Sequence, residues 1–92
     1  MSTKSILVLA RRDHGEAMRV AAGLTITGNQ VRLIFMTGVI ADNPDNARQA
    51  ELLDLSDIVP QTTVRAMADD LEFLELSALG AAIARSDRVV NL

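Results

Sequence analysis

The segment SILVLARRDHGEAMRVAAGL, residues 5–24, contains the clearest fold signal in this chain. Its first six residues are continuously apolar, which is typical of a strand whose two faces are both covered, as in a parallel sheet. The polar turn 11–15 follows, and Asp13 forms with Glu16 a pattern that caps the start of a helix. Apolar side chains then recur at helical spacing, at Ala17, Val20, Ala21 and Leu24. The stretch therefore predicts a strand that passes through a short turn into a helix.

The next segment returns the chain to the sheet. Gly28 and Asn29 are typical of a helix C-terminus. Residues 31–36 then form a second apolar segment, which ends at Thr37 and Gly38. The strand, helix and strand over residues 5–36 have the length that a right-handed βαβ crossover requires.

Alternating elements continue to the end of the chain. Asn43 is a favoured N-cap and Pro44 a favoured first helical residue, so a second helix is expected to begin there and to end before Pro60. Three further elements are expected, namely a third strand over 62–67, a helix over 77–85 and a final strand over 87–92. Residues 71–76 fit both an alternating strand and the face of a helix, and both alternatives remain open.

This order of elements predicts a single α/β domain over residues 1–92. Because short connections join alternating strands and helices, we expect three layers, with a mainly parallel sheet of four or five strands and helices on both faces. Ligands bind such sheets at the carboxyl ends of the strands. The loops 11–15, 37–43 and 68–70 are therefore the places to look for a site.

Composition excludes several classes of function. The net charge is −3 and no basic stripe is present, so we expect no nucleic-acid partner. The chain has no cysteine, which excludes disulfides and thiolate metal sites. No apolar run approaches the ~20 residues of a membrane span, and no signal peptide is visible. These features predict a cytoplasmic protein without a membrane partner.

The apolar content predicts self-association. Hydrophobic residues make up 49% of the chain, whereas a domain of this size has a small interior. Apolar side chains at 39–41, 52–55 and 58–59 exceed what one helical stripe can bury. We therefore expect a homo-oligomer, a dimer or a trimer.

Several segments resemble one family of small proteins. They are the opening strand 5–10, the turn and helix start 13–17, the junction 28–31, the segment 35–39 and the ending 86–92. Together they resemble the DsrE/DsrF/DsrH-like family of sulfur-relay proteins. The resemblance implies a flavodoxin-like domain that assembles as dimers, trimers or hexamers. It also implies that some subunits carry, after the third strand, a cysteine that receives and passes on persulfide sulfur.

This chain departs from that family at the reactive position. The corresponding residues 64–70 contain no cysteine, so sulfur-carrier activity does not transfer to this sequence. The resemblance therefore implies a non-catalytic DsrE-like domain that acts in intracellular sulfur relay through oligomer assembly or protein partners, other DsrE-like subunits among them. The sequence favours this role over that of an enzyme, and it assigns no catalytic residue and no cofactor.

The alternative function is that of a small anion-binding or ligand-binding module. The turn after the first strand and the end of the second strand supply its candidate residues, namely Arg11, Arg12, Asp13, His14, Thr37 and Gly38. Backbone N–H groups at a helix N-terminus favour anions, and arginine adds paired donors for phosphate, sulfate or carboxylate. The competing interpretation is a solvated polar loop in which Asp13 only caps the helix. No glycine-rich nucleotide-binding motif is present.

Two other groups of side chains are capable of acid–base chemistry. His14 is the only histidine, and it is expected to be an exposed loop residue without catalytic partners. Carboxylates gather at Asp69, Asp70, Glu72 and Glu75, where acid–base work competes with a solvated face as the explanation. One histidine and scattered acids do not form a metal site, so none is predicted.

Overall fold

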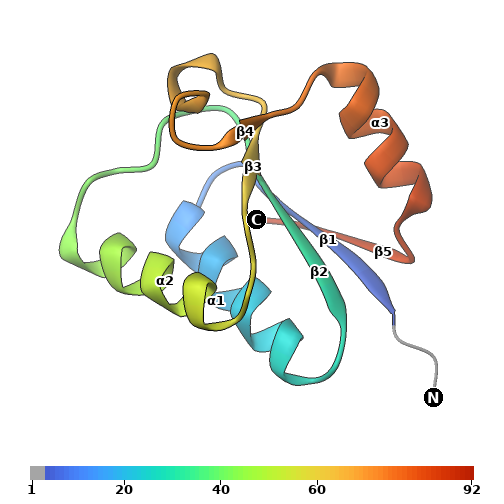
Figure 1. Cartoon of the computed structure of the whole chain (residues 1–92), viewed down its shortest axis with the longest axis horizontal. Coiled ribbons are helices and arrows are strands. Elements are labelled where there is room, and N and C mark those ends of the chain that lie inside the picture. The colour runs from blue at the N-terminus through green and yellow to red at the C-terminus, as the bar shows by residue number, and fades with distance from the viewer. Residues whose placement is uncertain (1–3) are drawn as a thin grey trace.

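The computed structural model describes residues 4–92 and has a five-stranded, all-parallel sheet (Figure 1). The strands lie in the order β4-β3-β2-β1-β5. In chain order the elements are β1 (Ser5–Ala10), α1 (His14–Ile26), β2 (Gln30–Phe35), α2 (Pro44–Leu55), β3 (Gln61–Thr62), the 3₁₀ helix η1 (Arg65–Met67), β4 (Glu72–Phe73), α3 (Leu76–Arg85) and β5 (Arg88–Asn91). The predicted α/β class, with helices on both faces of a parallel sheet, is confirmed.

The opening βαβ unit has the predicted form. Strands β1 and β2 pair in parallel, from Ser5 opposite Gln30 to Ala10 opposite Phe35. The Asp13 side chain accepts a hydrogen bond of 3.0 Å from the Glu16 N–H and so caps α1. These two strands form the centre of the sheet, which explains why both of them are apolar at nearly every position of their carboxyl halves.

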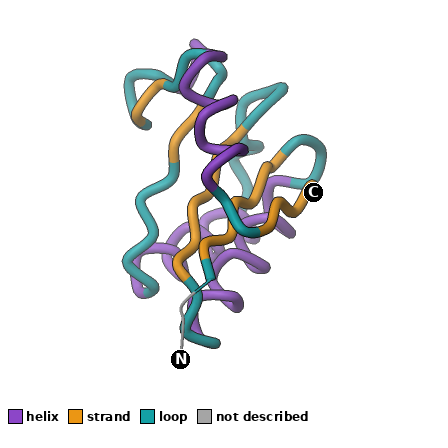
Figure 2. Tube along the Cα trace, turned by 90° about the vertical axis from the view of Figure 1, so that its right-hand side faces the viewer, coloured by secondary structure: helices purple, strands orange, loops and turns teal. Residues whose placement is uncertain are grey.

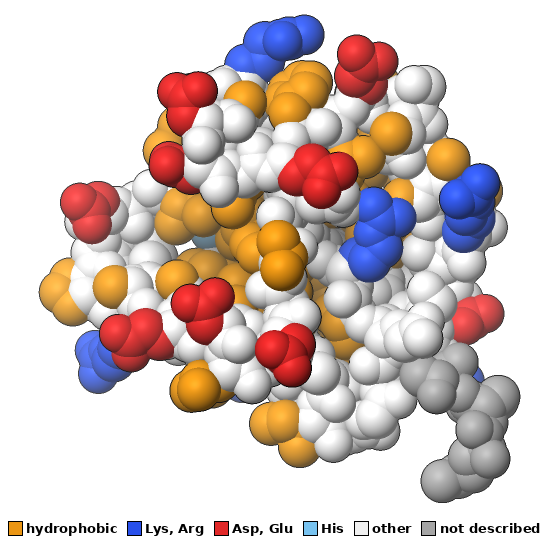
Figure 3. All heavy atoms as spheres, in the orientation of Figure 1, with side chains coloured by type: hydrophobic (Ala, Val, Ile, Leu, Met, Phe, Trp, Pro, Cys, Tyr) orange, Lys and Arg blue, Asp and Glu red, His pale blue; other side chains and the backbone are white. Residues whose placement is uncertain are grey.

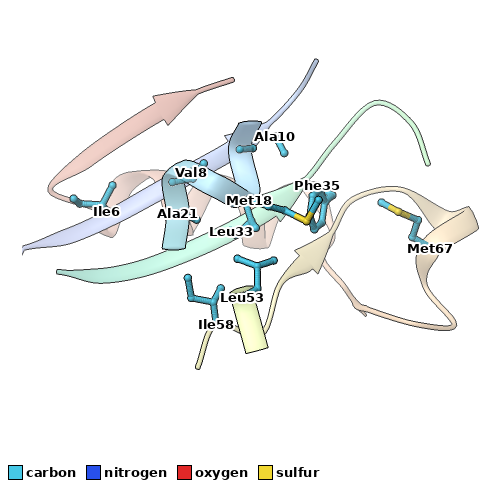
Figure 4. Close-up of a cluster of buried hydrophobic side chains, with 11 residues drawn as sticks. Ile6, Val8, Ala10, Met18, Ala21, Leu33, Phe35, Leu53, Ile58 and Met67 are labelled. Carbon is cyan, nitrogen blue, oxygen red and sulfur yellow. The ribbon is translucent and has the colours of Figure 1, made fainter. Parts of the chain in front are cut away.

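Each face of the sheet has its own apolar layer. Helix α1 covers one face and α2 packs against it, while α3 lies apart from both (Figures 1 and 2). The larger cluster of buried side chains lies on the face of α1 and α2, where Met18 lies beside Phe35 (Figure 4). A smaller cluster joins Leu79 and Ala82 of α3 to the other face of β1 and β2. The molecule is thus a three-layer structure, consistent with a flavodoxin-like fold.

The order of the strands in the sheet follows the order of the chain until the last strand, β5. Strands β1 to β4 lie side by side in chain order, and α3 then carries the chain back past them to β5, on the other side of β1. The direction of winding therefore reverses between β1 and β5, which is the place where open α/β sheets form ligand crevices. The connection from β3 to β4 differs from the others because it contains only the short helix η1.

The prediction of a third strand over 62–67 is wrong in extent. Strand β3 contains only Gln61 and Thr62. The buried Thr62 hydroxyl donates to the Phe35 carbonyl at 3.1 Å and accepts from the Val64 N–H at 2.9 Å. A side chain that bonds the backbone two residues ahead favours a turn over a continuing ladder, so the chain leaves the sheet here.

Residues 71–76 contain both of the predicted structures, first a strand and then the start of a helix. Glu72 and Phe73 pair with β3 as a short strand, and α3 begins at Leu76. The predicted final strand is confirmed as β5, which pairs with β1. No helix within residues 4–92 is long and apolar enough to cross a membrane.

The predicted apolar surface is partly correct. Val39, Leu55 and Val59 are 60%, 83% and 82% exposed. Ile58, which the sequence places on the same surface, is instead buried, and its N–H donates to the Leu53 carbonyl at 3.0 Å. The left-handed residue Asp57 turns the chain after α2, and this turn directs Ile58 back toward the sheet.

Candidate functional site at the carboxyl edge of the sheet

The turns after β1 and β2 are bonded to each other at the carboxyl edge of the sheet. The Met36 N–H donates to the Ala10 carbonyl at 2.9 Å, and the Thr37 hydroxyl donates to the Arg11 carbonyl. Because these bonds join two loops, the residues that the sequence predicted from separate segments lie at one edge. Arg11, Thr37 and their neighbours therefore belong to the same region of the structure.

The end of β5 holds the first turn from the other side. The N–H groups of Arg12 and Asp13 both donate to the Leu92 carbonyl, at 3.2 and 3.0 Å. A hollow of about 410 Å³ lies here, lined by Arg11, Arg12, Asn91 and Leu92. It sits between β1 and β5, where the winding of the sheet reverses. The arginine pair thus lies at the position where this class of fold binds ligands.

A second hollow, of about 500 Å³, lies between the first turns of α1 and α2. Asp13 caps α1, and Asn43 caps α2 by accepting from the Asn46 N–H at 2.8 Å. The wall of the hollow is formed by Arg12, Asp13, His14, Gly15, Val39, Ala41, Asn43 and Asn46. Two helix N-termini therefore face the same space, with a guanidinium group beside them.

Gly15 allows the two helices to approach each other closely. A Cβ atom at this position would lie 2.7 Å from the Asn46 side-chain oxygen, which is closer than real contacts allow. The Asn46 amide in turn donates to the Ala41 carbonyl at 2.8 Å and so holds the loop that leads into α2. A larger residue at position 15 would therefore require the Asn46 side chain to move away from α1.

His14 differs from its expected setting. It is the first residue of α1 and is half-buried, so the prediction of an exposed loop histidine is wrong. Its ring packs edge-on against Phe35, with ring centres 5.4 Å apart, and its Nε2 lies 3.2 Å from the Met36 carbonyl oxygen. Because a carbonyl only accepts hydrogen bonds, Nε2 is the protonated nitrogen in this contact. The helix start carries His14 inward, onto the end of β2.

Thr37 and Gly38 serve the loop and not either hollow. Thr37 has a φ of 73°, in the left-handed region that β-branched residues rarely occupy. Its hydroxyl donates to the Arg11 carbonyl, and the Gly38 N–H donates to the Met36 carbonyl at 3.0 Å. Neither residue lines the two hollows at this edge. Thr37 and Gly38 therefore stabilise the turn after β2.

One nearby pair of charges is self-contained. The Arg19 Nε donates to a Glu16 carboxylate oxygen at 3.0 Å across one turn of α1. This hydrogen bond lowers the pKa of Glu16 below its ordinary value and raises the pKa of Arg19. Arg19 is thus already paired, and it lines neither hollow of the carboxyl edge.

The acidic residues do not assemble into a metal site. Within residues 4–92, no group of three or more histidine, aspartate and glutamate side chains is placed to hold a metal ion. Asp69 and Asp70 lie in the turn after η1, and Glu72 and Glu75 lie on exposed positions beyond it.

Asn43 and Asn46 are the site residues that sequence reasoning missed. The N-cap signal at Asn43 was visible, but nothing in the sequence placed this cap beside that of α1. No protein-family model, curated protein or solved structure matches the chain.

Proposed function

We propose that this chain is a binding module for small anions or for ligands with an anionic group, such as phosphate, sulfate or carboxylate. The observation that supports it most is the convergence of the N-termini of α1 and α2 on one hollow beside Arg12. The site lies at the carboxyl edge of a parallel sheet, where ligands bind in this architecture.

The two helix ends supply donors that the fold leaves unused. The first N–H groups of a helix have no partner within it, and they carry the positive end of the helix dipole. Asp13 and Asn43 each engage one of these groups, at Glu16 and Asn46. The N–H groups ahead of them remain available to an anion, two in α1 and one in α2, because Pro44 has no N–H. Arg12 would add a charged, forked donor.

Chemical-shift titration of the protein with inorganic phosphate and with sulfate tests this function. We expect saturable shifts in the backbone amides of 12–16, 43, 45 and 46, weakened about tenfold in Arg12→Ala, because a charge-assisted hydrogen bond contributes ~1.5–3 kcal/mol. Lys4→Ala is the matched control, since Lys4 is exposed at the opposite edge of the sheet. Equal weakening in both variants would mean that only net charge matters, and would refute the site.

A second function is supported by the surface. The resemblance to DsrE-like proteins predicts a non-catalytic, cytoplasmic subunit of a sulfur relay that works by assembly, and the exposed Leu55 and Val59 favour such an association. Because the chain has no cysteine, any persulfide would have to be carried by a partner subunit. The two functions are compatible, because these apolar residues line neither hollow of the carboxyl edge.

A further inference from the structure

The face of the sheet that α1 and α2 cover has an unfilled helical position. When successive parallel strands are added in one direction, their right-handed crossover connections all lie on the same face of the sheet. Each of these connections usually contains a helix. Here α1 and α2 serve the first two crossovers, whereas the third, over residues 63–71, contains only η1. A groove of about 430 Å³ remains between α2 and this short connection.

The floor of the groove is apolar. Its lining includes the hydrophobic side chains of Met18, Phe35, Ile40, Leu53, Ile58 and Leu71. Four of these side chains belong to the buried core, where Leu53 and Ile58 lie below the strands and Met18 lies beside Phe35 (Figure 4). In the space-filling view hydrophobic side chains gather in a hollow left of the centre (Figure 3). The groove thus opens directly onto the larger core, beside the exposed Ala47 and Ala50 of α2.

The rim of the groove is acidic. Glu51 and Asp54 line it from α2, and neither forms a salt bridge within residues 4–92. The segment 39–76, which supplies most of the groove's lining, contains nine acidic and two basic side chains, whereas the rest of the chain contains three acidic and seven basic ones. Figure 3 shows acidic side chains on both sides of the hollow. The negative charge of the protein is therefore concentrated where the helix is missing.

We propose that this groove binds an amphipathic helix from a partner protein, with an apolar stripe flanked by lysine or arginine. The α2 residues that line the groove run from Ala47 to Asp54, so the incoming helix would lie beside α2 over about two turns. Its apolar stripe would cover Phe35 and Leu53, while its basic residues would face Glu51 and Asp54.

A second copy of this chain does not have the required chemistry. Each of α1, α2 and α3 contains a single arginine and no lysine, and α2 itself contains three acidic residues. The groove also shares no lining residue with the hollow at the N-termini of α1 and α2. The partner-helix proposal therefore does not depend on the anion-binding function.

Fluorescence anisotropy with labelled synthetic peptides of about 14 residues tests the proposal. The probe is a leucine–lysine peptide whose leucines fall on one helical face. Its controls are a scrambled peptide of the same composition and a leucine–glutamate peptide with the same pattern. We expect saturable one-to-one binding of the amphipathic basic peptide alone, weakened by salt. Equal binding of the scrambled peptide, or no binding of the amphipathic one, would overturn the proposal.

Charge reversal locates the binding surface. Glu51→Lys and Asp54→Lys should each raise the Kd of the basic peptide about fivefold to tenfold, because like charges then meet across the interface. Glu75→Lys makes the same change of net charge at an exposed position outside the groove and should leave the Kd unchanged. Thermal melts confirm that the variants are folded. An equal loss in all three variants, or self-association that Glu51→Lys abolishes, would contradict a partner helix as the occupant.

Discussion

Thr37 shows how a single residue joins the two loops of the candidate site. Its backbone lies in the left-handed region, with a φ of 73°, which is strained for a β-branched side chain. Its hydroxyl donates to the Arg11 carbonyl and so connects the turn after β2 to the turn after β1. The cost of the strained backbone is offset by a bond that only a side-chain donor at this position can make.

Two substitutions at Thr37 separate the bond from the strain. Thr37→Val removes the hydroxyl and keeps the β-branch, so we expect a loss of about 1 kcal/mol in the free energy of unfolding. Thr37→Gly removes both, so the relief of strain should offset part of that loss. Urea denaturation measures the two values. A glycine variant less stable than the valine variant would show that strain at Thr37 is negligible.

At the scale of the element, α1 and α2 end in the same manner with different residues. Gly28 follows α1 with a φ of 88°, and Asp57 follows α2 with a φ of 59°. After α2, the Asp57 N–H donates to the Asp54 carbonyl and the Ile58 N–H to the Leu53 carbonyl, at 3.2 and 3.0 Å. This pair of bonds is the Schellman motif, in which glycine is the preferred left-handed residue.

Asp57→Gly is therefore expected to stabilise the protein. Glycine adopts the left-handed conformation without a Cβ clash, and we expect a gain of about 0.5–1 kcal/mol in the free energy of unfolding. Gly28→Ala makes the opposite change after α1 and should destabilise by a similar amount. Chemical denaturation followed by circular dichroism compares both variants with the parent chain. If Asp57→Gly lost stability, the aspartate side chain would have to make a contribution beyond the turn.

For the whole molecule, exposed apolar residues predict self-association. Leu55 and Val59 flank the end of α2 and are almost fully exposed, whereas the intervening Ile58 is in the core. A sheet with three helices of 10 to 13 residues leaves few places to bury further aliphatic side chains. A partner surface of ~800 Å² would cover them in a stable dimer or trimer.

Light scattering coupled to size exclusion tests this association. We expect a dimer or trimer at micromolar concentration, and Leu55→Lys and Val59→Lys should reduce its mass to that of one chain without loss of helix content. Ile58→Lys should instead unfold the protein, because it places a charge in the core. A single-chain mass for the parent protein would refute the prediction.

The βαβ unit over residues 5–35 could be predicted from the amino-acid sequence. Its signals are local, because each depends only on residues that are neighbours in the sequence. They are the apolar segments of β1 and β2, the cap at Asp13 and the helix boundaries at Gly28 and Pro44. Local chemistry sets such features, so the parallel sheet and the place of the arginine turn could be predicted. The same reasoning failed at Thr62, whose hydroxyl donates to the Phe35 carbonyl on β2 and accepts from the Val64 N–H, so that the chain turns out of the sheet.

The tertiary structure alone decided the rest. Asn46 lies beside Gly15 and His14 packs on Phe35, although neither pair is close in sequence. The unfilled helical position beside α2 likewise could not be predicted from the sequence. It arises because three crossover connections lie on one face of the sheet and only two of them contain a full helix. A pattern along the chain specifies which face of an element is apolar, whereas the packing of elements determines what that face meets.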